Sequence, residues 1–297
     1  MARSVSEQIE WEARAGRVAA GAAVLSLVLF VGGTVYGLTA VERRQPRTIG
    51  DLGALARDPF DFILPAVIAG IAFALVGVVL GFLYRATKYR RPQLPSAAFA
   101  LLVFGALGTG VTVIAQNIDF VNAAQSLSVS GANARAPVLE ELRGRVSLQV
   151  IAGLNLGGRL ALGLATVLIS VAAIRAGLMS LVLGILGVVA ALSQLLPLLL
   201  LQVLFILWLG ALAALFVDRW PGGRGPAWPS GEALPWPGAA QRNAEIDRRK
   251  AAAEVGEREG ADASSEASPD GDSDTHTPDN GGPPANSRQK RKRGRRR

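Results

Sequence analysis

Cysteine is absent from this 297-residue chain, and His276 is its only histidine. Without thiols the chain cannot form disulfides, thiolate metal sites or cysteine nucleophiles. A single imidazole also removes most acid–base, zinc and triad chemistry, because such sites combine histidine with further ligands or with a nucleophile. The sequence therefore indicates a protein that is not an enzyme, with no catalytic residue, cofactor site or metal site.

Charged residues are the second scarce group. They make up 18% of the chain, whereas 50% of its residues are hydrophobic, and a soluble domain usually has about 25% charged residues. A helix needs about 20 mostly apolar residues to cross a hydrocarbon core of about 30 Å. The uncharged runs predict an all-α, polytopic membrane domain over residues 1–218. Its six transmembrane helices are expected near residues 18–41, 62–84, 96–116, 149–174, 178–193 and 197–217.

The last two predicted helices share one run. Residues 176–217 contain no charge over 42 positions, and a helix of that length would extend about 63 Å. This is about twice the length of one span. Ser193, Gln194 and Pro197 are the only residues near the middle that favour a break. The run is therefore predicted to turn back at 193–197.

Six spans place both termini on one side of the membrane. Near the span ends that side holds ten Lys and Arg residues, against seven on the other. Because positive charge next to spans favours the cytoplasm, the sequence predicts a multi-pass protein of the bacterial cytoplasmic membrane with both termini cytoplasmic.

Residues 219–260 follow as a juxtamembrane segment rich in Trp and Pro. Trp220, Trp228 and Trp236 are each followed by proline, at intervals of eight residues. Tryptophan prefers the lipid headgroup region, and proline opposes helix formation. Two interpretations stay open: interfacial anchors on a strip along the membrane surface, or a Pro-rich linker with chance spacing. A short polar helix is predicted over residues 239–259.

Residues 261–297 have the composition of a disordered tail, rich in Ser, Asp, Gly and Pro. The tail ends in a polybasic run from Arg288 to Arg297, with eight basic residues in the last ten. Near an anionic leaflet each such charge contributes about 1 kcal/mol to binding. Contact with anionic lipid, contact with another polyanion, or a simply solvated charged end are the three alternatives.

Arg159 is the one charged residue inside a predicted span, and such residues are functional candidates. Asn155 lies four residues earlier, on the same helix face, and Gln116 and Asn117 end the third span. One hypothesis is a shallow polar pocket, open to the outer side, that binds an anionic or carbonyl-bearing ligand. The other is that Arg159 extends to the outer headgroups.

Three stretches resemble a family of uncharacterised bacterial integral membrane proteins, classified as a domain of unknown function. They are Arg14-Ala-Gly-Arg-Val-Ala, Leu83-Tyr-Arg-Ala-Thr-Lys88 and residues 171–189, in which a tight turn leads into a Gly-spaced helix. The resemblance covers residues 14–217. It implies a multi-pass helical fold and supplies no catalytic residues.

The sequence thus predicts a non-enzymatic integral membrane protein that acts through membrane and protein contacts. The alternative is a small-molecule transporter or channel for neutral or anionic solutes, with Arg159 and Asn155 lining its path. No Asp or Glu lies inside a predicted span, which weighs against proton- or cation-coupled transport, because that chemistry uses buried carboxylates.

Overall fold

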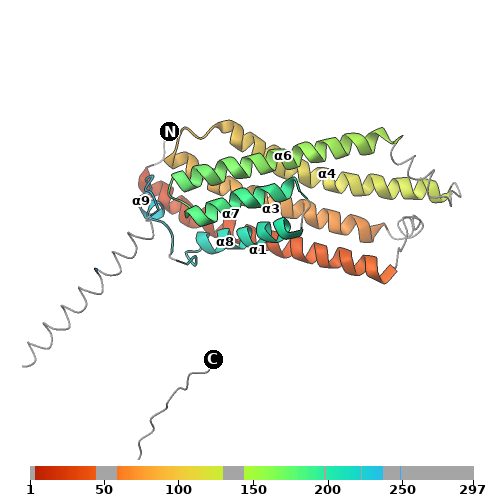
Figure 1. The fold of residues 1–297 in the computed structure, drawn as a ribbon, viewed down its shortest axis with the longest axis horizontal. Coiled ribbons are helices and arrows are strands. Elements are labelled where there is room, and N and C mark those ends of the chain that lie inside the picture. The colour runs from red at the N-terminus through yellow and green to blue at the C-terminus, as the bar shows by residue number, and fades with distance from the viewer. Residues whose placement is uncertain are drawn as a thin grey trace, which may run out of the picture. The chain divides into compact units, whose positions relative to one another are not determined.

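Four long helices form the body of the protein (Figure 1). In this computed structural model they are α1 (Val5–Arg44), α3 (Phe60–Arg90), α4 (Ser96–Val129) and α6 (Val146–Arg175). Each contains a stretch long and apolar enough to cross a membrane. The structure describes residues 4–44, 59–129, 144–196, 199–221 and 223–236, with Arg248 alone beyond them, and no strand occurs among these residues. The prediction of an all-helical, membrane-type fold is thus confirmed.

The helices extend beyond the spans that hydrophobicity predicted. α1 starts at Val5, well before residue 18, because Ser4 and Glu7 form a capping box at its start. The Ser4 backbone N–H donates to Glu7 at 2.8 Å, and the Glu7 backbone N–H donates to Ser4 Oγ at 3.3 Å. α4 likewise continues to Val129, past the predicted end at residue 116. Hydropathy locates the part of a helix that suits a bilayer, and local capping decides where the helix begins.

The 42-residue uncharged run forms a hairpin of two shorter helices. α7 (Leu181–Ala191) continues into one 3-10 turn, η1 (Leu192–Gln194), and α8 (Leu199–Phe216) packs against both. A Schellman turn precedes the hairpin: Gly177 has φ +74°, and the Leu178 N–H donates to the Ala173 carbonyl at 3.0 Å. The chain leaves η1 at Leu195 and Leu196, inside the predicted break, and residues 197–198 lie outside the described part.

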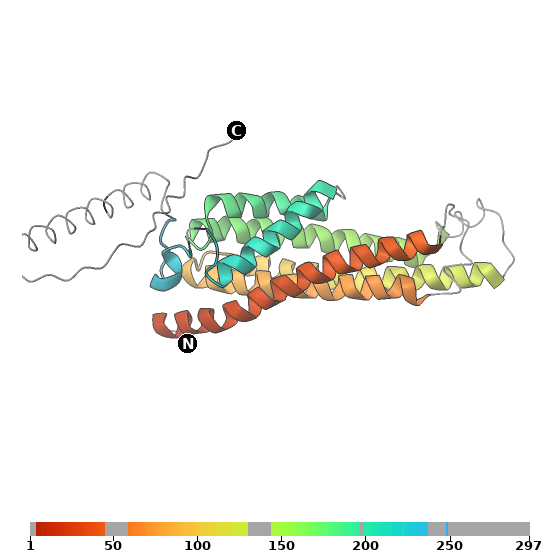
Figure 2. The same cartoon turned by 90° about the horizontal axis from the view of Figure 1, so that it is seen from below.

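The tip of this hairpin lies beside the middle of α6. A Cβ placed on Gly163 would lie 3.3 Å from the Ala191 carbonyl oxygen and 3.7 Å from Gln194 Cβ. Figures 1 and 2 show the hairpin stopping short of the far ends of α1, α4 and α6. From Leu181 to Gln194 the helix rises about 21 Å, less than the hydrocarbon core of about 30 Å. The hairpin therefore differs in length from the four long helices.

The long helices pack closely at glycines. A Cβ on Gly105 of α4 would lie 2.4 Å from the backbone nitrogen of Leu162 of α6, so the two backbones are nearly in contact there. Gly153 and Gly157 have the spacing of a helix-packing motif, yet a Cβ on either would meet nothing within 4 Å. Spacing alone did not identify the glycines at the helix contact.

The segment after α8 folds back onto the bundle. It contains one helical turn, α9 (Ala227–Ser230), which ends at Gly231 with φ +71°. Trp228 is 3% exposed, and α9 packs beside the start of α1. The described residues of this segment, as far as Trp236, pack against the core of the bundle. Neither a surface strip nor a loose linker describes α9, because Ala227 and Trp228 belong to the core.

Three predictions fall on residues outside the described part. These are the polar helix at 239–259, of which Arg248 alone is described, the disordered tail at 261–297, and the basic run from Arg288 to Arg297.

Candidate functional site

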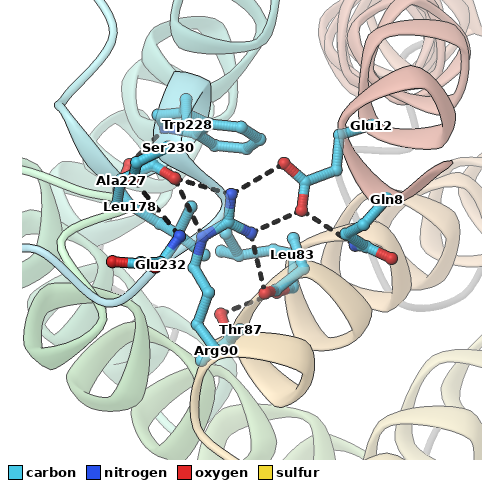
Figure 3. Close-up of polar contacts among 11 residues, drawn as sticks. Gln8, Glu12, Leu83, Thr87, Arg90, Leu178, Ala227, Trp228, Ser230 and Glu232 are labelled. Carbon is cyan, nitrogen blue, oxygen red and sulfur yellow. Dashed lines mark hydrogen bonds and ion pairs between the residues drawn. The ribbon is translucent and has the colours of Figure 1, made fainter. Parts of the chain in front are cut away.

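A buried ion pair lies where α1, α3 and α9 meet (Figure 3). Arg90 is the last residue of α3, and its side chain is fully buried; that of Glu12 on α1 is 3% exposed. Arg90 Nη1 donates to one carboxylate oxygen of Glu12, and Nη2 donates to the other at 2.9 Å. Such a two-bond pairing of guanidinium and carboxylate is the strong, oriented form of an ion pair.

The remaining polar atoms around the pair also have partners. Arg90 Nε and Nη2 donate to the Ala227 carbonyl at 3.0 and 2.7 Å, and Nη1 donates to the Ala86 carbonyl at 3.1 Å. Gln8 Nε2 donates to Glu12 Oε1 at 2.9 Å. A buried charge is tolerated when it is paired and hydrogen-bonded, and both charges here meet that condition.

Trp228 covers the ion pair. Its ring centroid lies 5.8 Å from the Arg90 guanidinium and 5.1 Å from that of Arg224. Its indole N–H donates to the Leu178 carbonyl at 2.9 Å. We call Gln8, Glu12, Arg90, Ala227 and Trp228 the terminal clamp, because they join the N-terminal helix α1 to the segment that follows α8.

The terminal clamp changes the position expected for the tryptophans. One of the two interpretations of the sequence placed Trp220, Trp228 and Trp236 at the lipid headgroups as interfacial anchors, whereas the structure places Trp228 in the interior. Trp220 and Trp236 are half-buried and pack against the same core. Interfacial contact by these two stays a prediction.

The sequence reasoning missed Glu12 and Arg90 altogether. Both lie in charged stretches that flank predicted spans, and a hydropathy scale treats every charged residue there as exposed to water. They are 78 residues apart, and nothing in their local sequence marks them as buried. Only the side-by-side placement of α1 and α3 brings them together.

A second polar group lies between α4 and α6. Asn155 is 9% exposed, and its Nδ2 donates to Thr112 Oγ1 at 3.1 Å. Arg159 is half-buried, and its Nε has no hydrogen-bond partner; the buried Thr109 Oγ1 has none either. We call Thr109, Thr112, Asn155 and Arg159 the polar row. A buried guanidinium N–H that has no hydrogen-bond partner suits an anion or a carbonyl oxygen.

Two predicted members do not join the polar row. Asn117 Nδ2 donates to the Val113 carbonyl of its own helix at 2.9 Å. Gln116 is half-buried, and among the described residues no hydrogen bond links it to Asn155 or Arg159. The structure brings Thr112 to Asn155 instead, since Thr112 lies one turn further from the α4 end than Gln116.

Arg159 lies near the middle of α6. Ser147 Oγ donates to Asp119 Oδ2 at 2.7 Å and marks a polar level at one end of the helix pair. From that level Arg159 is about 18 Å along the helix, and Arg175 is about 24 Å further. The tip of the α7–α8 hairpin is one turn away, at Gly163. A side chain at this depth is far from both polar ends of its helix.

The described residues include no group of three or more His, Cys, Asp and Glu side chains that could hold a metal ion. Comparison of the chain with protein-family models, with curated proteins and with solved structures gives no match. The terminal clamp and the polar row therefore carry the functional argument.

Proposed function

We propose that the protein is a multi-pass protein of the bacterial cytoplasmic membrane that acts through lipid and protein contacts and catalyses no reaction. The terminal clamp is the observation that supports this proposal. It fixes the segment that contains α9, which precedes the charged tail in the sequence, against the first helix. The tail that follows this segment would contact a partner or a lipid surface.

Within this proposal the α7–α8 hairpin enters and leaves the bilayer from the cytoplasmic side, while α1, α3, α4 and α6 cross it. The six spans expected from sequence would require Leu181 to Gln194 to cross about 30 Å with a rise of about 21 Å. Irregular backbone at membrane depth is tolerated where protein covers it, and Ser193 and Gln194 are both buried at 7% exposure. Four and six crossings alike leave both termini cytoplasmic.

The absence of cysteine allows a clean test of orientation and of tail contact. In a Ser287→Cys variant, a membrane-impermeant maleimide is expected to label inside-out vesicles and to leave right-side-out vesicles unlabelled. A Ser130→Cys variant, in the connection between α4 and α6, should show the opposite pattern. Labelling of the Ser287→Cys variant in right-side-out vesicles would contradict the cytoplasmic tail.

The same Ser287→Cys variant, carrying an environment-sensitive dye on its thiol, reports on lipid contact. In nanodiscs containing phosphatidylglycerol its emission should shift to the blue, and 0.5 M salt should reverse the shift, because about 1 kcal/mol per basic residue is electrostatic and screened. A matched variant with the eight terminal Lys and Arg residues changed to Gln should show no shift. Equal emission in phosphatidylcholine and phosphatidylglycerol would contradict lipid contact by the tail.

A second candidate function, solute binding or transport, is supported by the polar row. An ionisable side chain within an apolar helix is a functional-site hypothesis, and Arg159 Nε is buried without a partner. The tip of the hairpin beside it would close such a site from the cytoplasmic side. Neutral or anionic solutes fit this chemistry, since the described polar row carries a cation and no carboxylate.

Thermal-shift measurements with chloride, acetate and inorganic phosphate test this candidate. An anion held at the polar row should raise the Tm by several degrees at about 100 times its Kd, which corresponds to about 2.7 kcal/mol. The Arg159→Leu variant should lose this shift, while Arg175→Leu, which removes an exposed arginine at the other end of α6, should keep it. Equal shifts in both variants would exclude Arg159 as the ligand-binding group.

A further inference from the structure

An apolar groove runs along the side of the bundle between α1, α3 and α4. Its volume is about 460 Å³, within the usual range of about 300–1,000 Å³ for small-molecule sites. Its lining includes three small residues of α3, Ala74, Gly77 and Gly81, together with residues of α1 and α4. At Gly81 the missing side chain leaves open space, because a Cβ there would meet nothing within 4 Å.

The groove opens to the outside of the bundle along its length. Val18 of α1 is 67% exposed, Val78 of α3 is 48% exposed and Leu107 of α4 is 53% exposed, and all three line it. On a helix that crosses a bilayer, such side chains face acyl chains. The groove is therefore accessible from the lipid and not only from water.

One end of the groove is charged. Arg85 is the only charged residue among its lining residues, and it lies at the same end as Trp11 and Phe99. Arg85 is exposed, and no hydrogen bond or ion pair joins it to another described residue. At this end α3 reaches the terminal clamp at Arg90. A cation therefore lies at one end of the groove, and apolar residues line the rest of it.

The length of the groove matches one leaflet. From Arg85 to Ala74 the α3 helix extends about 16 Å, and half of a hydrocarbon core is about 15 Å. An acyl chain that lay in the groove would thus begin at Arg85 and end near the bilayer midplane.

We propose that this groove binds one anionic phospholipid of the cytoplasmic leaflet, with an acyl chain along Ala74, Gly77 and Gly81 and the phosphate on Arg85. The inference rests on the proposed membrane location and orientation, and it is independent of the tail. The charge at the Arg85 end selects this occupant over a second copy of the chain, because an unpaired arginine at a helix–helix contact would need a carboxylate, and the lining of the groove supplies none.

Native mass spectrometry of the full-length protein, released from detergent and titrated with phosphatidylglycerol or phosphatidylcholine, tests the proposal. The wild-type protein should retain one phosphatidylglycerol in preference to phosphatidylcholine. Gly81→Leu should abolish this retention, since a Cβ on Gly81 meets nothing within 4 Å and the larger side chain fills the groove without straining the backbone. Arg85→Gln should weaken phosphatidylglycerol binding about fivefold, as expected from about 1 kcal/mol per interfacial cation.

Two variants serve as controls. Gly21→Leu places the same side chain at an open position of α1 outside the groove, and Arg17→Gln removes an exposed arginine of α1 that does not line it. Both should bind phosphatidylglycerol as the wild type does. Thermal unfolding of all four variants in the same detergent verifies that they are folded.

Retention of phosphatidylglycerol by Gly81→Leu would overturn the groove as the binding site. Equal affinity of wild type and Arg85→Gln would overturn the role of Arg85. A change of oligomeric state in Gly81→Leu with unaltered lipid binding would identify the groove as a contact between two copies, and would also overturn the proposal. None of these results affects the maleimide labelling of the Ser287→Cys variant, so a failure here is distinguishable from a failure of the proposed membrane topology.

Discussion

Replacing Arg90 by alanine is expected to lower the free energy of unfolding of the membrane domain by about 3–5 kcal/mol, the cost of removing one partner of a buried ion pair. The change leaves Glu12 buried with Gln8 as its only remaining partner in the terminal clamp. It also removes both donors to the Ala227 carbonyl. For a domain of this size the Tm in mild detergent should fall by about 10 °C.

Arg91→Ala is the matched control. Arg91 carries the same charge at the next position, lines a surface pocket and is only half-buried, so its removal should change stability by less than about 0.5 kcal/mol. The double variant Glu12→Leu/Arg90→Leu should recover much of the loss, because apolar residues of similar volume often replace a buried pair without penalty. Circular dichroism during heating measures all three.

The Arg90 variant should also release the segment after α8. Limited trypsin digestion is expected to cut at Arg219 or Arg224 faster in Arg90→Ala than in Arg91→Ala, because α9 loses its attachment to α3. If Arg90→Ala and Arg91→Ala unfold at the same temperature and are cut at the same rate, the terminal clamp contributes nothing to stability and the interpretation is wrong.

Gly105→Ala is expected to destabilise the protein by about 3 kcal/mol, at the upper end of overpacking effects. The added Cβ would lie 2.4 Å from the Leu162 backbone nitrogen and 2.7 Å from its Cα. Both are backbone atoms, so no side-chain rotation relieves the clash and α4 must move away from α6. The separation also weakens the Asn155–Thr112 hydrogen bond, which bridges the same two helices.

The same substitution at Gly157 should act in the opposite direction. Nothing lies within 4 Å of a Cβ there, and alanine in a helix is favoured over glycine by about 0.5–1 kcal/mol. The Tm of Gly157→Ala should therefore rise by a few degrees while that of Gly105→Ala falls, both read by heating in the same detergent. Equal effects at the two positions would contradict the close backbone contact of α4 and α6.

The four long helices were predictable because hydropathy reports how costly each segment is to place in lipid, and this cost dominates the energy of a membrane-type protein. A charge inside a bilayer is costly, so uncharged runs such as residues 62–84 mark helices irrespective of their neighbours. α3 and α6 contain the predicted spans within a few residues. The same reasoning identified Arg159 as unusual, and the structure leaves its Nε unpaired.

The start of α1 shows where this reasoning stops. Residues 5–17 are too charged for a span, so the predicted helix began at residue 18. The chain is nevertheless helical from Val5, because Ser4 and Glu7 cap it locally and Trp11 packs on Phe82, with ring centroids 5.6 Å apart. The Ser4–Glu7 cap is a short-range signal that the sequence itself contains. The Trp11–Phe82 contact exists only in the folded chain.

Composition and the order of uncharged runs determined that this chain has a helical, membrane-type fold with one charged residue inside the predicted spans, because lipid excludes charge whatever the tertiary arrangement. The tertiary structure alone decided that Glu12 and Arg90 pair, that Trp228 is buried above them, and that the α7–α8 hairpin ends beside the middle of α6. Each of these depends on contacts between segments far apart in sequence. These contacts stabilise the fold through short-range geometry, such as a two-bond ion pair or a backbone packed against a glycine. The local composition of the sequence does not show which segments will meet in this way.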